Sequence, residues 1–384
     1  MALLPIPSPN DQALSQQLAS LIQQKIEDNN GWIDFATFMH MALYTPNLGY
    51  YSGGAKKFGL RGDFVTAPEI SPLFSKTIAV QAAQILACSD GDDPAANILE
   101  LGAGTGKLAA DLLLELNELN QLPKQYFILE VSAHLRHIQR ETLHKQLSAE
   151  LFNKLVWLET LPKSFTGLVL GNEVLDAIPV HLIHHTAQGW RERGVGINGE
   201  FMWQDAELSA PNLIDNLPVD LPIGYVAEVC PAVSALVYSL AEMLETGVIL
   251  LIDYGFSARE YYHPQRNQGT LMCHYQHYAH DNPLTHIGLQ DMTAHVNFTQ
   301  IAHACKQVRV AGYVSQAQFL INCGILTILQ QLSPNDSAYM KLAAAAQKLM
   351  SPAEMGDLFK VIAFTKSIDA PLLGFKSGDK THTL

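Results

Sequence analysis

The stretch that most constrains this chain runs from Asn97 to Asp111. It starts with a short apolar run of strand character and continues, from residue 107 to 118, with leucines at helical spacing. Between them stand Gly102, Gly104 and Gly106. Glycines permit a tight turn and a close approach to a ligand, and the N–H groups of the first helical turn face the same space. The stretch therefore predicts a strand, a loop and a helix that bind a nucleotide-like ligand.

Charge indicates which ligand this loop takes. A P-loop requires glycine at position 101 and Ser or Thr at position 108, but both positions hold leucine. Glu100 precedes the loop, where its carboxylate would repel a pyrophosphate. S-adenosylmethionine has no phosphate and carries a sulfonium and an ammonium group, so an acid at this place favours it. We expect S-adenosylmethionine as the cofactor, close to the three glycines.

A second acid, Glu130, follows the apolar segment 126–129, which has the character of the next strand. In that position a carboxylate would meet the ribose hydroxyls of the ligand. The alternative is an ordinary solvated acid at a strand end. We expect Glu100 and Glu130 to bracket one nucleoside.

Strands and helices alternate from residue 97 to residue 171, which predicts a parallel sheet with crossover helices. Ligands bind at the carboxyl ends of such strands. The expected fourth strand, 167–171, is followed by the catalytic candidates Asn172, Glu173 and Asp176. The expected fifth strand, 247–252, is followed by Asp253 and Tyr254, which we place on the substrate side.

Composition excludes several classes of partner. The net charge of −13 disfavours a nucleic-acid partner and suits a basic substrate or a cationic cofactor. No apolar run approaches the roughly 20 residues that cross a bilayer, and the amino terminus shows no export or import signal. The five cysteines are scattered, without a Cys-x-x-Cys pair, which indicates reduced thiols. We expect a cytoplasmic protein with no membrane partner and leave a homodimer open.

Several segments outside the expected sheet also carry recognisable patterns. Residues 10–28 predict an amphipathic helix, and residues 53–71, rich in glycine and aromatics, predict either a segment that closes over a ligand or an ordinary surface loop. Residues 181–203 alternate in polarity, which predicts a β-hairpin. On a helix, the spacing of His274, His277 and His280 could place two metal ligands on one face, but no acid or cysteine joins them at ligand spacing. We therefore expect no metal.

Six motifs occur in order along the chain, at residues 62–71, 100–106, 171–180, 252–255, 291–298 and 355–361. Together they resemble the MidA family, whose mitochondrial members are protein arginine methyltransferases required for the assembly of respiratory complex I. The resemblance covers nearly the whole chain. Ala67, Met292 and Asn297 replace the serine, leucine and aspartate that are common in the family.

The resemblance implies an α/β fold of the class I, Rossmann-like methyltransferase type and S-adenosylmethionine as cofactor. It places a helical cap and lid loop in residues 1–94 and the core in residues 95–384, with insertions near 181–222, 256–300 and 312–352. Thr66 and Glu69 of the first motif and Asn172 of the third are assigned to the cofactor. In mitochondrial members the activity is symmetric dimethylation of a protein arginine, so the resemblance implies a protein substrate and a link to assembly of a respiratory complex.

An arginine acceptor suits the acids of this chain. A guanidinium is permanently protonated and a poor nucleophile, so an enzyme must orient it and hold its charge, which carboxylates do. Glu173 and Asp176 are the first candidates for this clamp, and Asp253 and Glu228 are second candidates whose alternative is a structural role. His295 is the candidate proton acceptor.

Two further classes of function remain open. The chain is alternatively an assembly factor that holds a partner protein and uses the cofactor only structurally. The third class, a nicotinamide-dependent oxidoreductase, rests on Gly104, Gly106 and Ala109, which fit a loose dinucleotide fingerprint, and Glu100 argues against it. The sequence does not identify the target protein or the number of methyl groups added.

Overall fold

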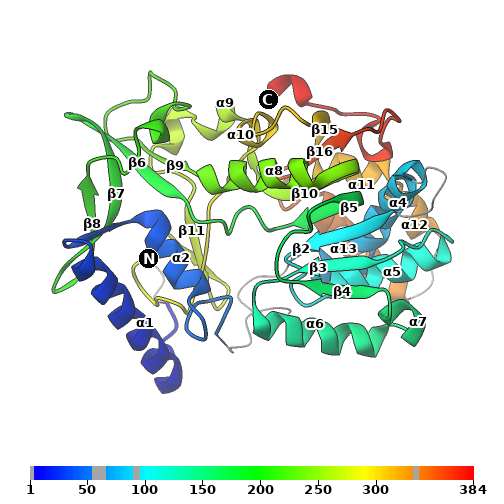
Figure 1. The fold of residues 1–384 in the computed structure, drawn as a ribbon, viewed down its shortest axis with the longest axis horizontal. Helices are drawn as coiled ribbons and strands as arrows, with labels where there is room; N and C mark the ends of the chain where they lie inside the picture. The colour runs from blue at the N-terminus through cyan, green and yellow to red at the C-terminus, as the bar shows by residue number, and fades with distance from the viewer. Residues whose placement is uncertain (1–3, 54–65, 90–95, 332–336) are drawn as a thin grey trace. The chain divides into compact units, whose positions relative to one another are not determined.

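The computed structural model describes residues 4–53, 66–89, 96–331 and 337–384, which form two compact units (Figure 1). Unit 1 contains residues 1–64, 176–234 and 258–295, and unit 2 contains residues 65–175, 235–257 and 296–384. Most of the expected closing segment, residues 54–65, lies outside the described residues. Unit 1 thus joins the expected amino-terminal cap to two of the expected insertions.

Unit 2 is built on an eight-stranded sheet in the order β15-β16-β10-β5-β2-β3-β4, with β14 paired to β10. The strands β4, β3, β2, β5 and β10 run parallel, whereas β16 is antiparallel to both β10 and β15. The predicted α/β class I arrangement is confirmed. The strand bounds are β2 Asn97–Leu101, β3 Tyr126–Leu129, β4 Leu155–Leu158, β5 Phe165–Asn172, β10 Leu244–Phe256, β14 Val296–Asn297, β15 Arg309–Ser315 and β16 Phe359–Lys366.

Apolar strands explain why this sheet is buried on both faces. Residues 248–252 of β10 are at most 1% exposed, as expected of a β-branched and leucine-rich strand in a parallel sheet. Helices α4 and α5 share one apolar core with the sheet and with the helices near the carboxyl terminus. The helix bounds in this unit are α3 Ala67–Ile70, α4 Pro72–Ser89, α5 Lys107–Glu118, α6 Ala133–Gln146, α7 Ala149–Phe152, α10 Phe298–Ala302, α11 Gln316–Asn322, α12 Ile325–Gln330, α13 Ser337–Met350, η3 Leu373–Phe375 and η4 Thr381–Thr383.

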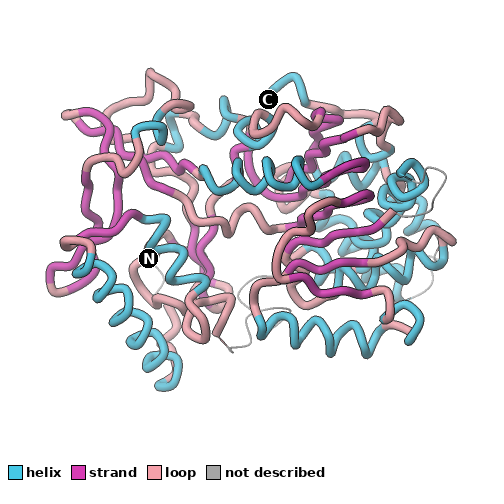
Figure 2. The backbone as a smooth tube through the Cα atoms, in the orientation of Figure 1, coloured by secondary structure: helices cyan, strands magenta, loops and turns pink. Residues whose placement is uncertain are grey.

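Unit 1 contains a five-stranded antiparallel sheet in the order β1-β7-β6-β9, with β8 paired to β7 (Figure 2). The predicted first helix is confirmed as α1, whose buried residues Leu18, Ile22 and Ile26 recur at helical spacing and whose amino terminus is capped by Ser8. The bounds are α1 Pro9–Asp28, β1 Trp32–Asp34, α2 Phe35–Tyr44, β6 His181–Thr186, β7 Gly189–Asn198, β8 Glu200–Ala206, η1 Pro211–Ile214, β9 Val226–Val229, α9 Ala258–Tyr261, η2 Pro264–Arg266, β11 Met272–Tyr275, β12 Tyr278–His280 and β13 Asp291–Thr293. Helix α8, Pro231–Met243, contains the boundary between the two units at Ser234.

Several segments differ from the expectation. The alternating segment 181–203 forms part of three strands, because a second turn before Gly189 adds to the one at Gly199. The histidine-rich segment is the β-hairpin β11–β12, and its turn residues Gln276 and His277 have φ values of +48° and +68°. The helical spacing considered for a metal is therefore absent there. Within the expected insertion near 312–352, Gly324, whose φ is +87°, separates the two short helices α11 and α12.

Within the described ranges, the structure has no helix that combines the length and the apolar character needed to span a bilayer. All five cysteines are free thiols, as expected, and Cys273, Cys305 and Cys323 are buried.

Candidate active site

The glycine loop joins β2 to α5 at the carboxyl edge of the unit 2 sheet. Its three glycines all adopt left-handed backbone conformations, with φ values of +59° at Gly102, +52° at Gly104 and +84° at Gly106. A side chain at position 106 would crowd Gln139, 3.3 Å from its Cα atom, whereas a Cβ at Gly104 would meet no atom of another described residue within 4 Å, its chain neighbours aside. The loop thus keeps its backbone open at Gly104, as a loop that receives a ligand requires.

Glu100 of β2 is 2% exposed and its Oε2 accepts a hydrogen bond of 2.7 Å from the Tyr126 hydroxyl on β3. Burial and, to a smaller extent, the nearby charge of Glu130 raise the pKa of Glu100 to about 7, although the Tyr126 hydrogen bond lowers it. A carboxylate with a raised pKa gains most from a cationic ligand, because such a ligand stabilises its charged form. The two acids that were expected to bracket one nucleoside therefore do influence each other.

Glu130 is held by a network that the sequence did not reveal. Its Oε2 accepts a hydrogen bond of 2.9 Å from Nε2 of Gln139 on α6, and the same nitrogen donates to the carbonyl oxygen of Gly104 at 3.1 Å. Trp157 donates to Gln139 Oε1 at 3.0 Å, and the N–H of Ser132 donates to Glu130 Oε1 at 2.9 Å. Gln139 thereby ties the second acid to the glycine loop. The signal that could have identified Gln139 is its spacing: it lies four residues after Leu135 and four before Leu143, on the apolar face of the helix.

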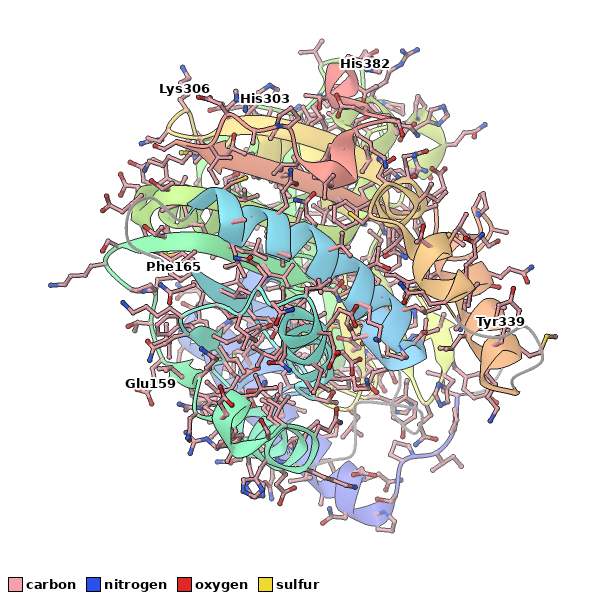
Figure 3. All side chains as sticks on the ribbon, turned by 90° about the vertical axis from the view of Figure 1, so that its right-hand side faces the viewer. Glu159, Phe165, His303, Lys306, Tyr339 and His382 are labelled. Atoms are coloured by element: carbon pink, nitrogen blue, oxygen red, sulfur yellow. The ribbon has the colours of Figure 1, made fainter. Side chains whose placement is uncertain are left out.

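Burial raises the pKa of Glu130, although its hydrogen bonds and the charge of Arg136 oppose this effect. Arg136 lies in the first part of α6 and donates to the carboxylate of Glu159 at 3.0 Å. Glu159 lies in the loop between β4 and β5, on the surface of unit 2 (Figure 3). The positive charge near Glu130 is therefore itself paired at the surface.

The turn after β5 contains the strongest catalytic candidates of the sequence. Glu173 has a φ of +53°, a strained conformation for a residue other than glycine that is common at functional sites. Its Oε1 accepts hydrogen bonds of 3.1 Å from Asn172 Nδ2 and of 3.1 Å from the N–H of Ala67. Asn172 Oδ1 is buried and has no hydrogen-bond partner in the described part of the chain. Such an orphaned acceptor fits the ammonium group of an S-adenosylmethionine molecule.

The first motif of the sequence meets the glycine loop through helix α3. Thr66 occupies the N-cap position of this helix without a side-chain capping bond, and Glu69 in its first turn accepts a hydrogen bond of 2.5 Å from the Thr105 hydroxyl. Because Glu173 accepts from Ala67, the helix is fastened to both the glycine loop and the turn after β5. Direct hydrogen bonds therefore join Glu69 to Thr105 of the glycine loop, and Glu173 to Ala67 next to Thr66.

Asp253, at the carboxyl end of β10, is fully buried. Its Oδ2 accepts hydrogen bonds from the N–H groups of Val174 at 3.1 Å and Leu175 at 2.8 Å. Tyr254 is 8% exposed and packs against Phe359 with ring centroids 5.4 Å apart. Asp253 thus holds the backbone that follows Glu173, and Tyr254 belongs to the apolar core.

The remaining candidates belong to unit 1. The carbonyl oxygen of Asp176 accepts a hydrogen bond of 3.0 Å from Ala294, next to His295. The Tyr51 hydroxyl donates to Asp291 Oδ1 at 2.8 Å. Burial raises the pKa of Tyr51, and the charges of Asp291 and Asp176 raise it further. Asp291 and Tyr51 are neighbours of Asp176 that the sequence analysis did not assign to the site.

Asp34, His181 and Glu192 of unit 1 lie close enough to share a cation. Each has another role: His181 Nδ1 lies 2.6 Å from Glu192 Oε1, Ser209 donates to Glu192 Oε2, and Asp34 caps α2 through Thr37. A separation of 2.6 Å is that of a hydrogen bond, and two ligands of one metal lie farther apart. We therefore interpret this cluster of side chains as a hydrogen-bonded structural feature and not as a metal site.

Comparison with known proteins identifies the family of the chain and the cofactor of that family. Residues 77–314 match the family described as "Putative S-adenosyl-L-methionine-dependent methyltransferase". The chain is 30% identical to the mouse mitochondrial protein arginine methyltransferase NDUFAF7, over 93% of this chain and 86% of the mouse protein, and 29% identical to the human one over 87% and 80%. A Burkholderia thailandensis protein crystallised with S-adenosyl-homocysteine has 47% identity and a TM-score of 0.95, with both chains covered completely. The cofactor expected from Glu100 and the glycines is thus that of the family: the chain is an S-adenosylmethionine-dependent methyltransferase and belongs to the MidA family, which its motifs resemble.

Proposed function

We propose that this methyltransferase transfers the methyl group to an arginine of a protein, with symmetric dimethylation as its product. The observation that carries this proposal is the relationship over 93% of the chain to a protein named as an arginine methyltransferase. An active site that presents several acids supports it, because a guanidinium needs carboxylates to hold its charge. A role in assembly of a respiratory complex and a location in the cytoplasm remain predictions, and the vertebrate relatives are named as mitochondrial.

The residues of unit 2 fit the cofactor. Gly104 leaves room beside the loop, Asn172 offers an orphaned acceptor, and Glu100 and Glu130 offer carboxylates. We assign these residues to the cofactor together with Gly102, Gly106, Thr66 and Glu69. When bound, S-adenosylmethionine supplies an electrophilic methyl group on a sulfonium.

For the transfer itself we assign Glu173 and Asp176 to the guanidinium of the substrate and His295 to the proton that leaves it. A carboxylate that accepts two parallel N–H bonds orients the planar group and leaves one nitrogen aimed at the methyl. The strained backbone of Glu173 supports this role, since strain of this kind is kept where function requires it.

The other substrate-side candidates receive different parts. Asp253 binds the backbone of Val174 and Leu175, so we assign it to positioning Glu173 instead of contacting the substrate directly. We assign Tyr254 to the same support, because it packs in the core. Glu228 stays on the substrate side.

The proposal is tested by methyl transfer from tritiated S-adenosylmethionine to lysate proteins. Glu173→Gln removes the charge but keeps an oxygen that accepts from Ala67, and Asp176→Asn is equally conservative. Each should lower the transfer rate by on the order of a hundredfold, while S-adenosylhomocysteine still binds. Glu150→Gln, at an exposed position of α7, should change neither. Normal transfer by both variants would contradict the assignment of the clamp.

A further inference from the structure

Unit 1 contains a cavity of about 930 Å³ that none of the roles above explains. Its size is that of pockets that bind small molecules or several side chains of a peptide. Its lining includes no residue of the glycine loop and neither Asn172 nor Glu173. It is lined by Gln23, Leu182, Arg193, Ile197, Gly199, Glu200, Phe201, Met202, Trp203, Val226, Glu228, Gln268, Leu271, Asp281, Asn282, Leu284 and Thr285.

One face of the antiparallel sheet contributes to this cavity. Glu228 on β9 is paired with Leu182 on β6, Leu182 with Arg193 on β7, and Arg193 with Asp205 on β8. Residues directly opposite one another in antiparallel strands point to the same face of a sheet. A row of side chains therefore crosses four strands, with an acid at each end.

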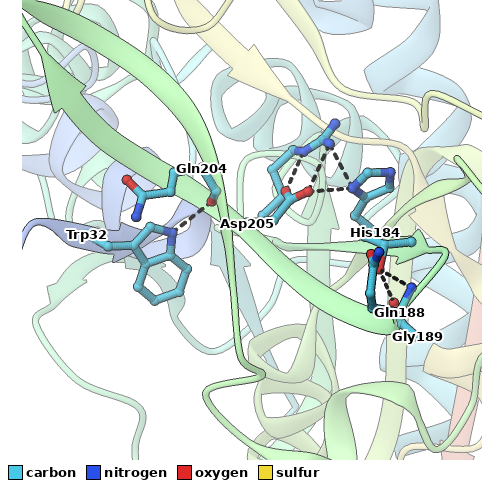
Figure 4. Close-up of polar contacts among 8 residues, drawn as sticks. Trp32, His184, Gln188, Gly189, Gln204 and Asp205 are labelled. Carbon is cyan, nitrogen blue, oxygen red and sulfur yellow. Dashed lines mark hydrogen bonds and ion pairs between the residues drawn. The ribbon is translucent and has the colours of Figure 1, made fainter.

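The acid on β8 is neutralised within this row. Arg193 Nε donates to Asp205 Oδ1 at 2.9 Å, and His184 Nδ1 lies 2.6 Å from Asp205 Oδ2 (Figure 4). Burial alone would raise the pKa of Asp205, but its bonds to Arg193 and His184 outweigh burial and lower it. The guanidinium of Arg193 is thus committed to Asp205.

The acid on β9, Glu228, is 3% exposed and forms no salt bridge with any described residue. Its Oε1 accepts hydrogen bonds from the N–H groups of Thr270 and Leu271, the second at 2.8 Å, and its Oε2 accepts a long bond of 3.4 Å from the Tyr261 hydroxyl. Burial raises the pKa of Glu228, and these hydrogen bonds oppose the effect only in part. A buried carboxylate without a counter-ion is costly, and a cation that enters the cavity recovers part of that cost.

The backbone beside Glu228 is shaped around this carboxylate. Gly269 has a φ of +79°, and a Cβ at that position would collide with the carboxylate oxygens of Glu228. Glu200 and Asp281 add two further acids to the lining, against Arg193 as its one basic residue. Phe201, Met202 and Trp203 supply apolar surface, which suits the methylene groups and the planar head of an arginine side chain.

We infer that this cavity binds an arginine side chain of the protein substrate that flanks the methylated residue, with Glu228 as its counter-ion. The inference rests on the proposed function for the existence of a protein substrate. A guanidinium suits the site better than an ammonium, because it is more weakly hydrated and bonds carboxylates through a planar fork. The cavity recognises the substrate and takes no part in the transfer.

The test measures binding of a fluorescein-labelled peptide, with two arginines separated by glycines, to the full-length protein saturated with S-adenosylhomocysteine. A second peptide replaces both arginines by citrulline, which has the same shape without the charge. The wild-type protein should bind the arginine peptide at least about tenfold more tightly than the citrulline peptide. Glu228→Gln should remove this preference, and Glu207→Gln, at an exposed acid that follows β8 and lies outside the cavity lining, should keep it.

A second variant, Thr285→Lys, leaves Glu228 in place and introduces a competing cation into the lining; it should also weaken binding of the arginine peptide. The stabilisation by S-adenosylhomocysteine in thermal unfolding verifies that each variant is folded. Equal binding of both peptides by the wild-type protein, or an unchanged preference in Glu228→Gln, would overturn the inference. If the preference for the arginine peptide depends on Glu228 but no peptide or protein is methylated, the cavity binds arginine as inferred and the proposed function fails.

Discussion

At the scale of single residues, Glu100 shows how burial and function are coupled. Its carboxyl group is almost completely buried between β2 and β3, where water cannot stabilise its charge. A cationic cofactor provides that stabilisation only when it binds. In the absence of cofactor, the protein therefore holds an acid whose pKa of about 7 lies in the physiological range.

This pKa makes the free energy of unfolding depend on pH. Glu100 has a pKa near 4.5 when unfolded and about 7 when folded, so the native state binds the extra proton between these values. The stabilising contribution of Glu100 is therefore full below pH 4.5 and lost as pH rises through 7, a change of about 3 kcal/mol. Urea denaturation of the wild-type protein and of Glu100→Gln, from pH 5 to pH 8, measures it. The wild-type protein should lose stability relative to the variant as pH rises, and a constant difference would show that the group titrates normally.

A substitution at Gly104 tests whether the glycine loop binds the cofactor. Gly104→Val should abolish binding of S-adenosylhomocysteine, because the new side chain would occupy space that the described part of the chain leaves open. The left-handed backbone makes such a change cost roughly 1–2 kcal/mol of stability. Gly31→Val is the control. Gly31 lies in unit 1, in the turn after α1, and it has a φ of +89° and equally open surroundings among the described residues. Calorimetric titration should show lost binding in the first variant alone, and binding by both would remove Gly104 from the cofactor site.

At the scale of elements, α6 connects the second acid to the glycine loop through Gln139. Gln139→Leu leaves Glu130 with fewer donors and frees the carbonyl of Gly104, so it should cost about 1–3 kcal/mol of stability and lower the affinity for S-adenosylhomocysteine. Gln146→Leu, at the exposed end of the same helix, should leave both unchanged. Thermal unfolding with and without the ligand measures both effects. Equal behaviour of the two variants would show that the network does not support the site.

The elements of unit 2 were largely predictable, because each has a strong local signal. Strand β2, its glycine loop and α5 follow from apolar residues, glycines and leucine spacing over 22 consecutive residues, 97–118. Strand β9 was not predicted, since its four residues form a strand only by pairing with β6, more than 40 positions earlier in the chain. The β11–β12 hairpin was also missed, because its turn uses Gln276 and His277 where glycine or asparagine usually marks such a turn.

The residues of the site were predictable from the sequence, but the hydrogen bonds between them were not. The acids and glycines could be placed because they follow strands, and parallel strands end at one edge of their sheet. The bonds of Asp253 to Val174 and Leu175, and of Glu173 to Ala67, depend on segments far apart in the sequence. Their pairing follows from the packed sheet, and no local pattern contains it.

At the scale of the whole molecule, the chain divides its candidate residues between two units that are both interrupted in sequence. Unit 2 contains the glycine loop, the acids assigned to the cofactor, and Glu173. Unit 1 contains Asp176, His295 and the cavity around Glu228. The residues assigned to the cofactor therefore all belong to unit 2 and the cavity around Glu228 belongs to unit 1, so variants can test these two roles separately.

The central claim is that this chain methylates arginine in proteins. Its most direct test incubates the purified protein, or Glu173→Gln, with a lysate of cells that lack the gene and with S-adenosylmethionine that carries a trideuterated methyl group. Tandem mass spectrometry then identifies every labelled residue. The account predicts labelled arginine in one or a few proteins, with the fragmentation pattern of symmetric dimethylation, and none with the variant. Label found only on other residue types, or no label although the cofactor binds, would contradict it.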